Sequence, residues 1–158
     1  MFDQVDRVLY DLKHNPSSRR IITNLYNHAD LSEMALYPCA YSMTFNVSDG
    51  KLNAILNQRS QDVLAANAWN VCQYAALVLM FAQVSGLVPG EFVHVIADAH
   101  IYDRHVSIIE ELIGRPAHPA PSVTLNPDVT DFYDFTVYDF VLENYETGEK
   151  IGRFPVAI

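Results

Sequence analysis

The chain has 158 residues, enough for one domain with a sizeable core, and we expect a single domain over residues 1–158. A formal net charge of −9 argues against nonspecific nucleic-acid binding, and the sequence predicts neither a signal peptide nor a membrane span. With only two cysteines, Cys39 and Cys72, a disulfide framework is not expected, and a reducing cytoplasm fits the chain.

The first part of the sequence predicts one helix and two short elements. Apolar residues at helical spacing indicate an amphipathic helix over residues 2–14, which Asn15-Pro16 ends. Residues 20–26 are expected to form a short strand. Asp30 can then cap a brief helical turn that runs through Ala35.

A β-hairpin is predicted next. Alternating apolar side chains indicate a strand with one buried face over residues 41–47, and the alternation returns over residues 52–56. Asp49-Gly50 between them is a strong signal for a two-residue turn. Counted outward from this turn, Cys39 and Arg59 lie at nearly equal distances, so we expect them to be neighbours at the open end of the hairpin.

The second half of the sequence adds one strongly apolar helix and several smaller elements. Residues 68–84 are apolar almost all round, which predicts a helix buried on every side and closed by Gly86. Cys72 in this helix is interpreted as a packed core thiol. The remaining predicted segments are a strand over 91–98, a helix over 103–113, a Pro-rich surface crossing over 116–127 and a strand near 135–143. The pattern as a whole is that of an α+β fold.

Cys39 and Arg59 together indicate chemistry. A single cysteine in such a chain is more often a small buried hydrophobe than a nucleophile. A nucleophilic thiol needs nearby positive charge to stabilise its thiolate, and an arginine supplies that charge without losing its own proton. The pair therefore predicts a thiolate nucleophile.

Six segments, in this order and spacing, make the chain resemble the thymidylate synthase family. They are Asn15-Pro16-Ser17-Ser18-Arg19-Arg20, Leu31-Ser32-Glu33-Met34-Ala35-Leu36-Tyr37-Pro38-Cys39, Gln58-Arg59-Ser60-Gln61-Asp62, Trp69-Asn70, Asp98-Ala99-His100-Ile101-Tyr102 and Pro155-Val156-Ala157-Ile158. The resemblance covers the C-terminal two thirds of the family. It implies the family's mixed sheet packed against a central buried helix.

The resemblance implies a reaction and two substrates. In the family, deoxyuridine monophosphate (dUMP) is reductively methylated to dTMP with 5,10-methylenetetrahydrofolate as co-substrate. Cys39 matches the cysteine that adds to C6 of uracil and makes C5 nucleophilic toward the one-carbon unit. Arg59 has two expected roles, stabilising the thiolate and holding the phosphate.

The resemblance also implies contacts to the phosphate and a homodimer. Arg19 and Arg20 match a pair that crosses a dimer interface to the phosphate in the partner's site. Guanidinium groups suit this role because each can give two parallel hydrogen bonds to a phosphate. Gln58 and Ser60 flank Arg59 and are expected to add substrate contacts, Ser60 through its hydroxyl.

Base and sugar contacts are implied at three further residues. Asn70 matches the residue that reads the pyrimidine edge, and its amide offers an acceptor and a donor that complement N3–H and O4 of uracil. A flipped amide would serve cytosine, so neighbours must lock its orientation. Related dCMP hydroxymethylases tend to carry Asp at the matching place, which makes Asn70 favour uracil. His100 and Tyr102 match the pair that bonds the 3′-hydroxyl of the deoxyribose.

The folate site is implied at Asp62, which matches a pterin-contacting carboxylate, and at Ala157 and Ile158, which match the C-terminus that closes over folate. No metal site is predicted, because the remaining histidines lack metal-ligand spacing. These histidines are His14, His28, His94, His105 and His118.

Three departures from the family and one missing segment bear on activity. Ala40 stands where many members have His, residues 65–70 replace the usual Gly-x-Pro-Phe-Asn, and Ala97 stands where Gly is common. The family's N-terminal segment supplies a phosphate-loop arginine, a glutamate that organises proton transfer and tryptophans at the folate site. Loss of a positioned acid/base group typically costs about 10²–10⁴ in rate, so we expect nucleotide binding to survive better than turnover. Two alternatives are a pyrimidine nucleotide hydroxymethylase, in which water completes the reaction, and a nucleotide-binding module without turnover.

Overall fold

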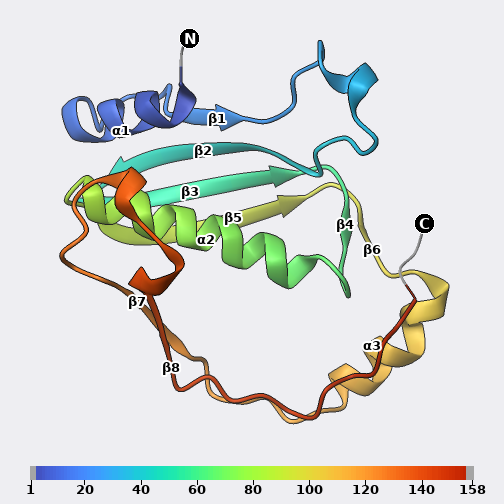
Figure 1. Cartoon of the computed structure of the whole chain (residues 1–158). Helices are drawn as coiled ribbons and strands as arrows, with labels where there is room; N and C mark the ends of the chain where they lie inside the picture. Colours follow the sequence, from blue (N-terminus) through green and yellow to red (C-terminus); the bar gives the residue numbers. More distant parts are fainter. Residues whose placement is uncertain (1–2, 156–158) are drawn as a thin grey trace.

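The centre of the fold is a mixed four-stranded sheet with the strand order β1-β2-β3-β5 (Figure 1). The structure is a computed structural model, and it describes residues 3–155. The main elements are α1 (Gln4–His14), β1 (Ile22–Asn24), β2 (Ala40–Ser48), β3 (Lys51–Gln58), α2 (Asn67–Val84) and β5 (Val88–Ile96). β1, β2 and β3 pair antiparallel, whereas β5 pairs parallel to β3. The predicted α+β fold with a mixed sheet packed against a helix is confirmed.

The β2–β3 hairpin forms as predicted. Asp49 and Gly50 occupy the turn with φ of 51° and 73°, a left-handed conformation that a two-residue turn requires and that Gly adopts without steric cost. The turn sets the register Ser48↔Lys51, which continues to Ala40↔Gln58 apart from a shift between Ala40 and Ser42. The residues just outside the strands, Cys39 and Arg59, are thereby neighbours.

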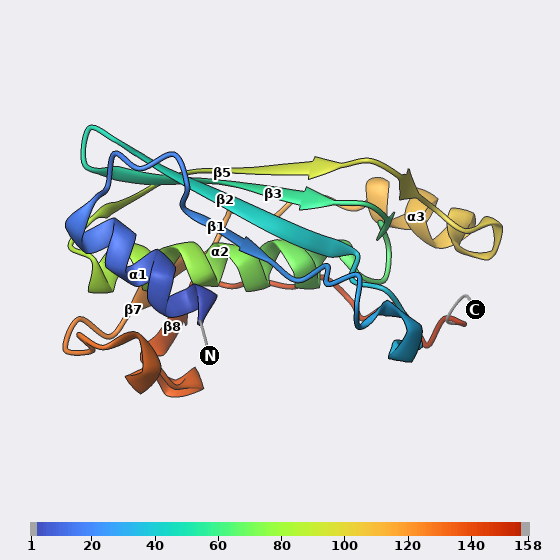
Figure 2. The ribbon, with the colours of Figure 1, turned by 90° about the horizontal axis from the view of Figure 1, so that it is seen from above.

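The core lies between one face of the sheet and α2. Alternate residues of β2 and β3 point inward, and Met43, Phe45 and Leu56 are fully buried against Phe81 and the other buried residues of α2. Figure 2 shows α1 and α2 on the same side of the sheet. The opposite face is therefore the more exposed one.

α2 differs from its predicted environment. Tyr74, Val78 and Phe81 are buried, but Trp69 is 78% exposed and Cys72 is also exposed. The prediction that the helix is buried on every side, with Cys72 as a core thiol, is therefore wrong for the described residues. The physical reason is that the sheet covers only one side of the helix.

Several predicted boundaries also need correction. The helical turn near residue 30 is a 3₁₀ helix over Leu31–Glu33 that Asp30 does not cap through its side chain. The strand predicted over 91–98 is β5, which begins earlier, and the helix predicted over 103–113 begins as a 3₁₀ turn (Asp103–His105) before α3 (Val106–Ile113).

No helix within residues 3–155 is long and apolar enough to cross a membrane.

The Pro-rich crossing contains an unpredicted strand. β7 (Ser122–Leu125) pairs antiparallel with β8 (Phe140–Glu143). Two 3₁₀ helices, Phe132–Asp134 and Val137–Asp139, occupy the loop between them, so the strand predicted near 135–143 begins only at Phe140. A further short parallel pair joins β4 (Gln61–Asp62) to β6 (Ala99–His100).

Gly90 in β5 leads to a prediction about stability. A methyl group at this position would collide with the side chain of Asn53 and lie 2.9 Å from the carbonyl oxygen of Leu52. We expect Gly90→Ala to lower the free energy of unfolding by about 1–3 kcal/mol, the usual cost of overpacking, in urea unfolding. Gly152→Ala is the control, because no atom lies within 4 Å of its added carbon. Equal destabilisation by both substitutions would contradict the prediction.

Candidate active site

The Cys39 thiol and the Arg59 guanidinium meet at the open end of the hairpin. The amide nitrogen of Arg59 donates to the carbonyl oxygen of Cys39 at 2.8 Å, and Arg59 Nη2 lies 3.8 Å from Cys39 Sγ. Arg59 Nε and Nη2 donate to the carbonyl oxygens of Pro38 at 3.0 Å and Tyr37 at 2.7 Å. These bonds to backbone acceptors hold the positive charge beside the thiol, as the hairpin count predicted.

Arg59 also lines a cavity of about 410 Å³. The other lining residues are Asn24, Tyr26, His28 and Tyr41. Tyr26 makes edge-on ring contacts with Tyr41 at 6.3 Å and with His28 at 5.2 Å between centroids. Tyr26 and His28 were not predicted as site residues, because neither belongs to a spacing pattern that indicates a site.

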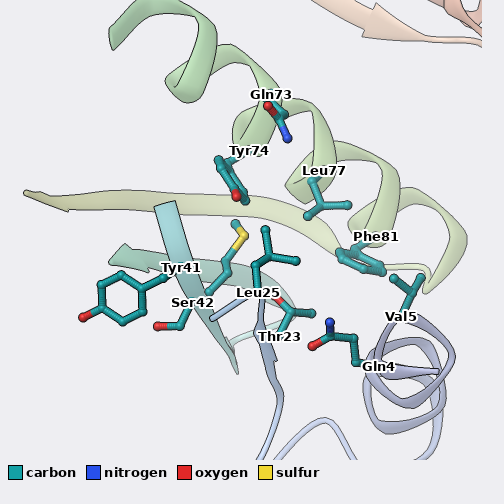
Figure 3. A pocket seen from close by; sticks show the side chains of 11 residues that line it. Gln4, Val5, Thr23, Leu25, Tyr41, Ser42, Gln73, Tyr74, Leu77 and Phe81 are labelled. Carbon is teal, nitrogen blue, oxygen red and sulfur yellow. The ribbon is translucent and has the colours of Figure 1, made fainter. Parts of the chain in front are cut away.

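A second cavity, of about 200 Å³, lies among α1, β1, β2 and α2 (Figure 3). Its lining is mainly apolar, with Met43, Leu77 and Phe81 among the residues. No cysteine, histidine or charged side chain lines it. It therefore offers hydroxyl groups but no base or charge to activate them, whereas a thiol and a guanidinium meet at Cys39 and Arg59.

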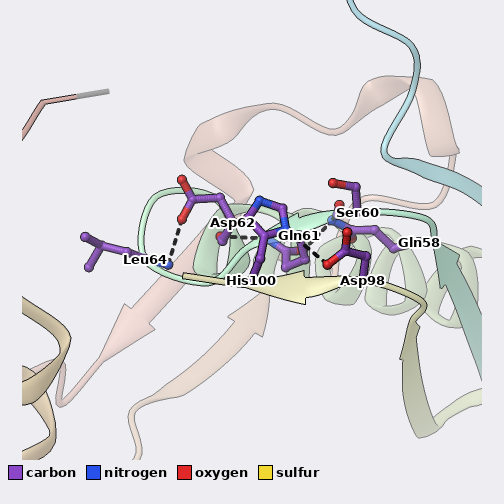
Figure 4. Close-up of polar contacts among 7 residues, drawn as sticks. All are labelled: Gln58, Ser60, Gln61, Asp62, Leu64, Asp98 and His100. Atoms are coloured by element: carbon purple, nitrogen blue, oxygen red, sulfur yellow. Dashed lines mark hydrogen bonds and ion pairs between the residues drawn. The ribbon is translucent and has the colours of Figure 1, made fainter. Parts of the chain in front are cut away.

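A buried amide network joins β3 to the first turn of α2. Gln58 is only 2% exposed, and its Nε2 donates to the carbonyl oxygen of Ser60 at 2.8 Å and to Asn70 Oδ1 at 3.1 Å. Gln58 Nε2 also bonds Gln61 Oε1 (Figure 4). The structure thus brings Gln58 and Asn70 together.

His94 contacts this network from β5. Its Nε2 lies 2.9 Å from Gln58 Oε1. Burial lowers the pKa of His94 below its ordinary value, because desolvation disfavours the charged imidazolium. Nothing in the sequence indicated this contact, because the only role that the spacing of His94 could test was that of a metal ligand.

The candidate sugar and pterin residues are neighbours across the β4–β6 pair, where Asp62 pairs with His100 (Figure 4). His100 Nδ1 lies 3.5 Å from Asp98 Oδ1, and its ring contacts that of Tyr102 edge-on at 5.1 Å between centroids. Asp62 Oδ1 accepts from the amide nitrogens of Leu64 at 3.0 Å and Ala65 at 3.1 Å. Asp62 thereby also shapes the turn that leads into α2.

Arg19 and Arg20 lie far from Cys39 in this chain. Both are exposed, and the next residue, Ile21, accepts through its carbonyl oxygen from the amide nitrogen of Phe45 at 2.9 Å. Phe45 is six residues along β2 from Cys39, which corresponds to about 20 Å at ~3.3 Å per residue. Figure 1 shows β1 beginning beside the middle of β2, away from the open end of the hairpin. The arginine pair and the thiol therefore do not share a site within one chain.

The C-terminal candidates, Ala157 and Ile158, lie outside the described residues. The segment just before them is anchored by His105, which is fully buried and whose Nε2 lies 2.7 Å from the carbonyl oxygen of Pro155. Among residues 3–155, no group of three or more His, Cys, Asp or Glu side chains could hold a metal ion.

Comparisons with known proteins agree on one family. The family model described as thymidylate synthase matches residues 1–158. Curated thymidylate synthases of Bacillus licheniformis and of Bacillus phage phi3T are 46% and 47% identical over 156 residues, which cover 99% of this chain and 56% of each relative. A solved thermostable thymidylate synthase A from Bacillus subtilis matches with a TM-score of 0.93 and 45% identity, covering 97% of this chain and 55% of that chain. The chain thus spans about half the length of these proteins.

Proposed function

The chain belongs to the thymidylate synthase family, and on this premise we propose that it binds dUMP and forms a covalent bond between Cys39 Sγ and C6 of uracil. The observation that carries this proposal is Arg59 Nη2 beside Cys39 Sγ at 3.8 Å. At this distance the guanidinium can donate to the sulfur and hold it in place for attack on the base. Attack forms the S–C6 bond and moves the C5=C6 electron pair to C5, which becomes the nucleophile for the one-carbon unit.

Arg59 can support phosphate binding at the same time. Its Nε and Nη2 are held by backbone carbonyls, whereas Nη1 has no hydrogen bond to any residue of the described range 3–155. A guanidinium with free N–H groups suits a phosphate dianion. We propose that Ser60, close by in the chain, adds its hydroxyl to this contact.

We propose a homodimer in which Arg19 and Arg20 of one protomer complete the phosphate site of the other. The separation of about 20 Å along β2 between Cys39 and Phe45, which bonds Ile21 next to the arginine pair, supports this arrangement. The sheet face opposite α2 supplies a candidate interface. Ile22 of β1, Ile55 of β3 and Val93 of β5 form one row across the sheet with Thr44 of β2, and all three are exposed. An exposed apolar row of this kind is suited to burial between two copies.

The one-carbon step of the proposal uses 5,10-methylenetetrahydrofolate as a co-substrate and produces dTMP and dihydrofolate. Family membership supports this step, and Asp62 is the described residue proposed to contact the pterin. His100 and Tyr102, next to Asp62 across the β4–β6 pair, are proposed to bond the 3′-hydroxyl of the sugar. Formation of dihydrofolate distinguishes this reaction from hydroxymethylation, in which water completes the reaction.

Nucleotide protection of Cys39 tests the proposal. At a dUMP concentration about ten times Kd, we expect alkylation of Cys39 to slow about tenfold, because only the unliganded fraction reacts. Mass spectrometry reports the labelling of each cysteine separately. Cys72 is the internal reference, because it is exposed and, two residues after Asn70, lies on nearly the opposite side of α2, so its labelling rate should stay constant. Equal labelling of Cys39 with and without dUMP would disprove the proposal.

A further inference from the structure

Two backbone carbonyls fix the orientations of the buried amides of Gln58 and Gln61. A carbonyl oxygen only accepts hydrogen bonds, so the end of Gln58 that lies 2.8 Å from the Ser60 carbonyl oxygen must be the NH₂ group. By the same reasoning, the end of Gln61 that lies 3.1 Å from the Asp62 carbonyl oxygen is its NH₂ group. This places Gln61 Oε1 against Gln58 Nε2, as observed, so the two assignments agree.

The fixed amide of Gln58 determines the orientation of Asn70. Gln58 Nε2 only donates, and its two N–H groups are shared among three acceptors, the Ser60 carbonyl oxygen, Gln61 Oε1 and the facing atom of Asn70, which at 3.1 Å is therefore Oδ1. Asn70 Nδ2 therefore turns away from Gln58, and it has no hydrogen bond to any residue of the described part of the chain. Asn70 is left with a free N–H donor and with the second lone pair of Oδ1.

His94 fixes the other end of Gln58. Gln58 Oε1 can only accept, so His94 Nε2, at 2.9 Å, must carry the hydrogen. His94 pairs with Leu56 across the β3–β5 register, which puts its side chain on the same face as Gln58, two residues further along β3. The contact therefore runs from β5 through β3 to α2.

We infer that His94 is a positioning residue that determines base specificity by holding Gln58, and through Gln58 the amide of Asn70, in the orientation that selects uracil. The inference rests on the proposed function, in which Asn70 reads the pyrimidine edge. A free N–H donor beside a carbonyl acceptor matches O4 and N3–H of uracil. The same pair opposes the 4-amino group and N3 of cytosine, which present the reverse pattern.

Loss of the His94 donor should relax this selection. Without it, Gln58 Oε1 is buried and unpaired, and only the Ser60 carbonyl and Gln61 still hold the Gln58 amide. A Gln58 side chain that rotates to pair Oε1 elsewhere would no longer hold Asn70, which could then present either end to the base. Uracil then loses part of its advantage and cytosine gains a binding mode. A purely structural role for His94 would instead weaken both nucleotides equally.

The test is competition binding of dUMP and dCMP to the full chain and three variants. In His94→Leu, we expect the preference for dUMP to fall by roughly five- to tenfold, the effect of one misoriented polar contact. His94→Gln keeps a side-chain N–H donor and should restore most of the preference. His118→Leu is the matched control, because His118 is exposed and bonded to Glu146, remote in sequence from the network. An unchanged preference in His94→Leu, or an equal loss for both nucleotides, would overturn the inference.

A second measurement needs no ligand. Nitrogen-15 NMR of the histidine rings reports which nitrogen carries the hydrogen, and we expect His94 to be protonated at Nε2 with Nδ1 bare at neutral pH. If the chain binds dUMP but His94 carries its hydrogen on Nδ1, the inference fails and the proposed function stands. If the chain binds neither nucleotide, the proposed function fails and the specificity role of His94 fails with it.

Discussion

Cys39→Ser is expected to abolish the release of tritium from C5 of labelled dUMP in the presence of 5,10-methylenetetrahydrofolate. The hydrogen at C5 is lost only after a nucleophile has added to C6, so the measurement follows the covalent step directly. A serine hydroxyl is a weak nucleophile without an adjacent base. Removal of the nucleophile in other covalent enzymes costs up to about 10⁶ in rate, and we expect a loss of at least about 10⁴ here.

Controls separate this effect from misfolding. Cys72→Ser changes the exposed cysteine of α2 and should release tritium at the rate of the unmodified chain. Cys39→Ser should still bind dUMP, because Arg59 remains held by the carbonyls of Tyr37 and Pro38. Tritium release by Cys39→Ser at an undiminished rate would exclude Cys39 as the nucleophile. Binding of dUMP without tritium release by the unmodified chain would favour a nucleotide-binding module.

Mixing two defective chains is expected to restore nucleotide binding. An Arg19→Ala/Arg20→Ala chain keeps Cys39 but lacks the proposed phosphate pair, and each charged hydrogen bond contributes about 1.5–3 kcal/mol, so its dUMP affinity should fall roughly 100-fold. A Cys39→Ala chain keeps the arginine pair. In a heterodimer, the arginines of the second chain complete the site that contains Cys39 of the first.

The readout is again protection of Cys39 from alkylation, which requires no turnover. With equal amounts of both chains and random pairing, about half of the Cys39 side chains should become protectable at dUMP concentrations that leave the double variant unprotected. The control partner carries Cys39→Ala together with both arginine substitutions and should rescue nothing. Absence of rescue by the Cys39→Ala partner, or a monomeric protein at the assay concentration, would contradict shared sites.

The position of the candidate nucleophile could be predicted from the sequence because a hairpin has a strict period and a recognisable turn. Asp49-Gly50 fixed the register, and the register placed Cys39 beside Arg59. The environment of α2 could not be predicted in this way. A helical segment with apolar residues on all sides is expected to bury a large part of its surface. The sequence does not show which sides of the helix another element will cover.

The contact between His94 and Gln58 also could not be predicted from sequence patterns. His94 is a single histidine on a strand, more than thirty residues from Gln58 in the chain. Its role depends on the parallel pairing of β3 with β5, whose register is set by the crossover through α2. The strand β7 was missed for a different reason, since four residues in a Pro-rich stretch give too little alternation to detect.

The separation of Arg19 and Arg20 from Cys39 also has a consequence for the protein at low concentration. If two chains build each phosphate site, nucleotide binding and subunit association share one free energy, and each strengthens the other. Dilution would then weaken the apparent affinity for dUMP by dissociating the dimer, and saturating dUMP would lower the concentration at which chains associate. Supply of the nucleotide would in this way regulate how much of the protein is assembled.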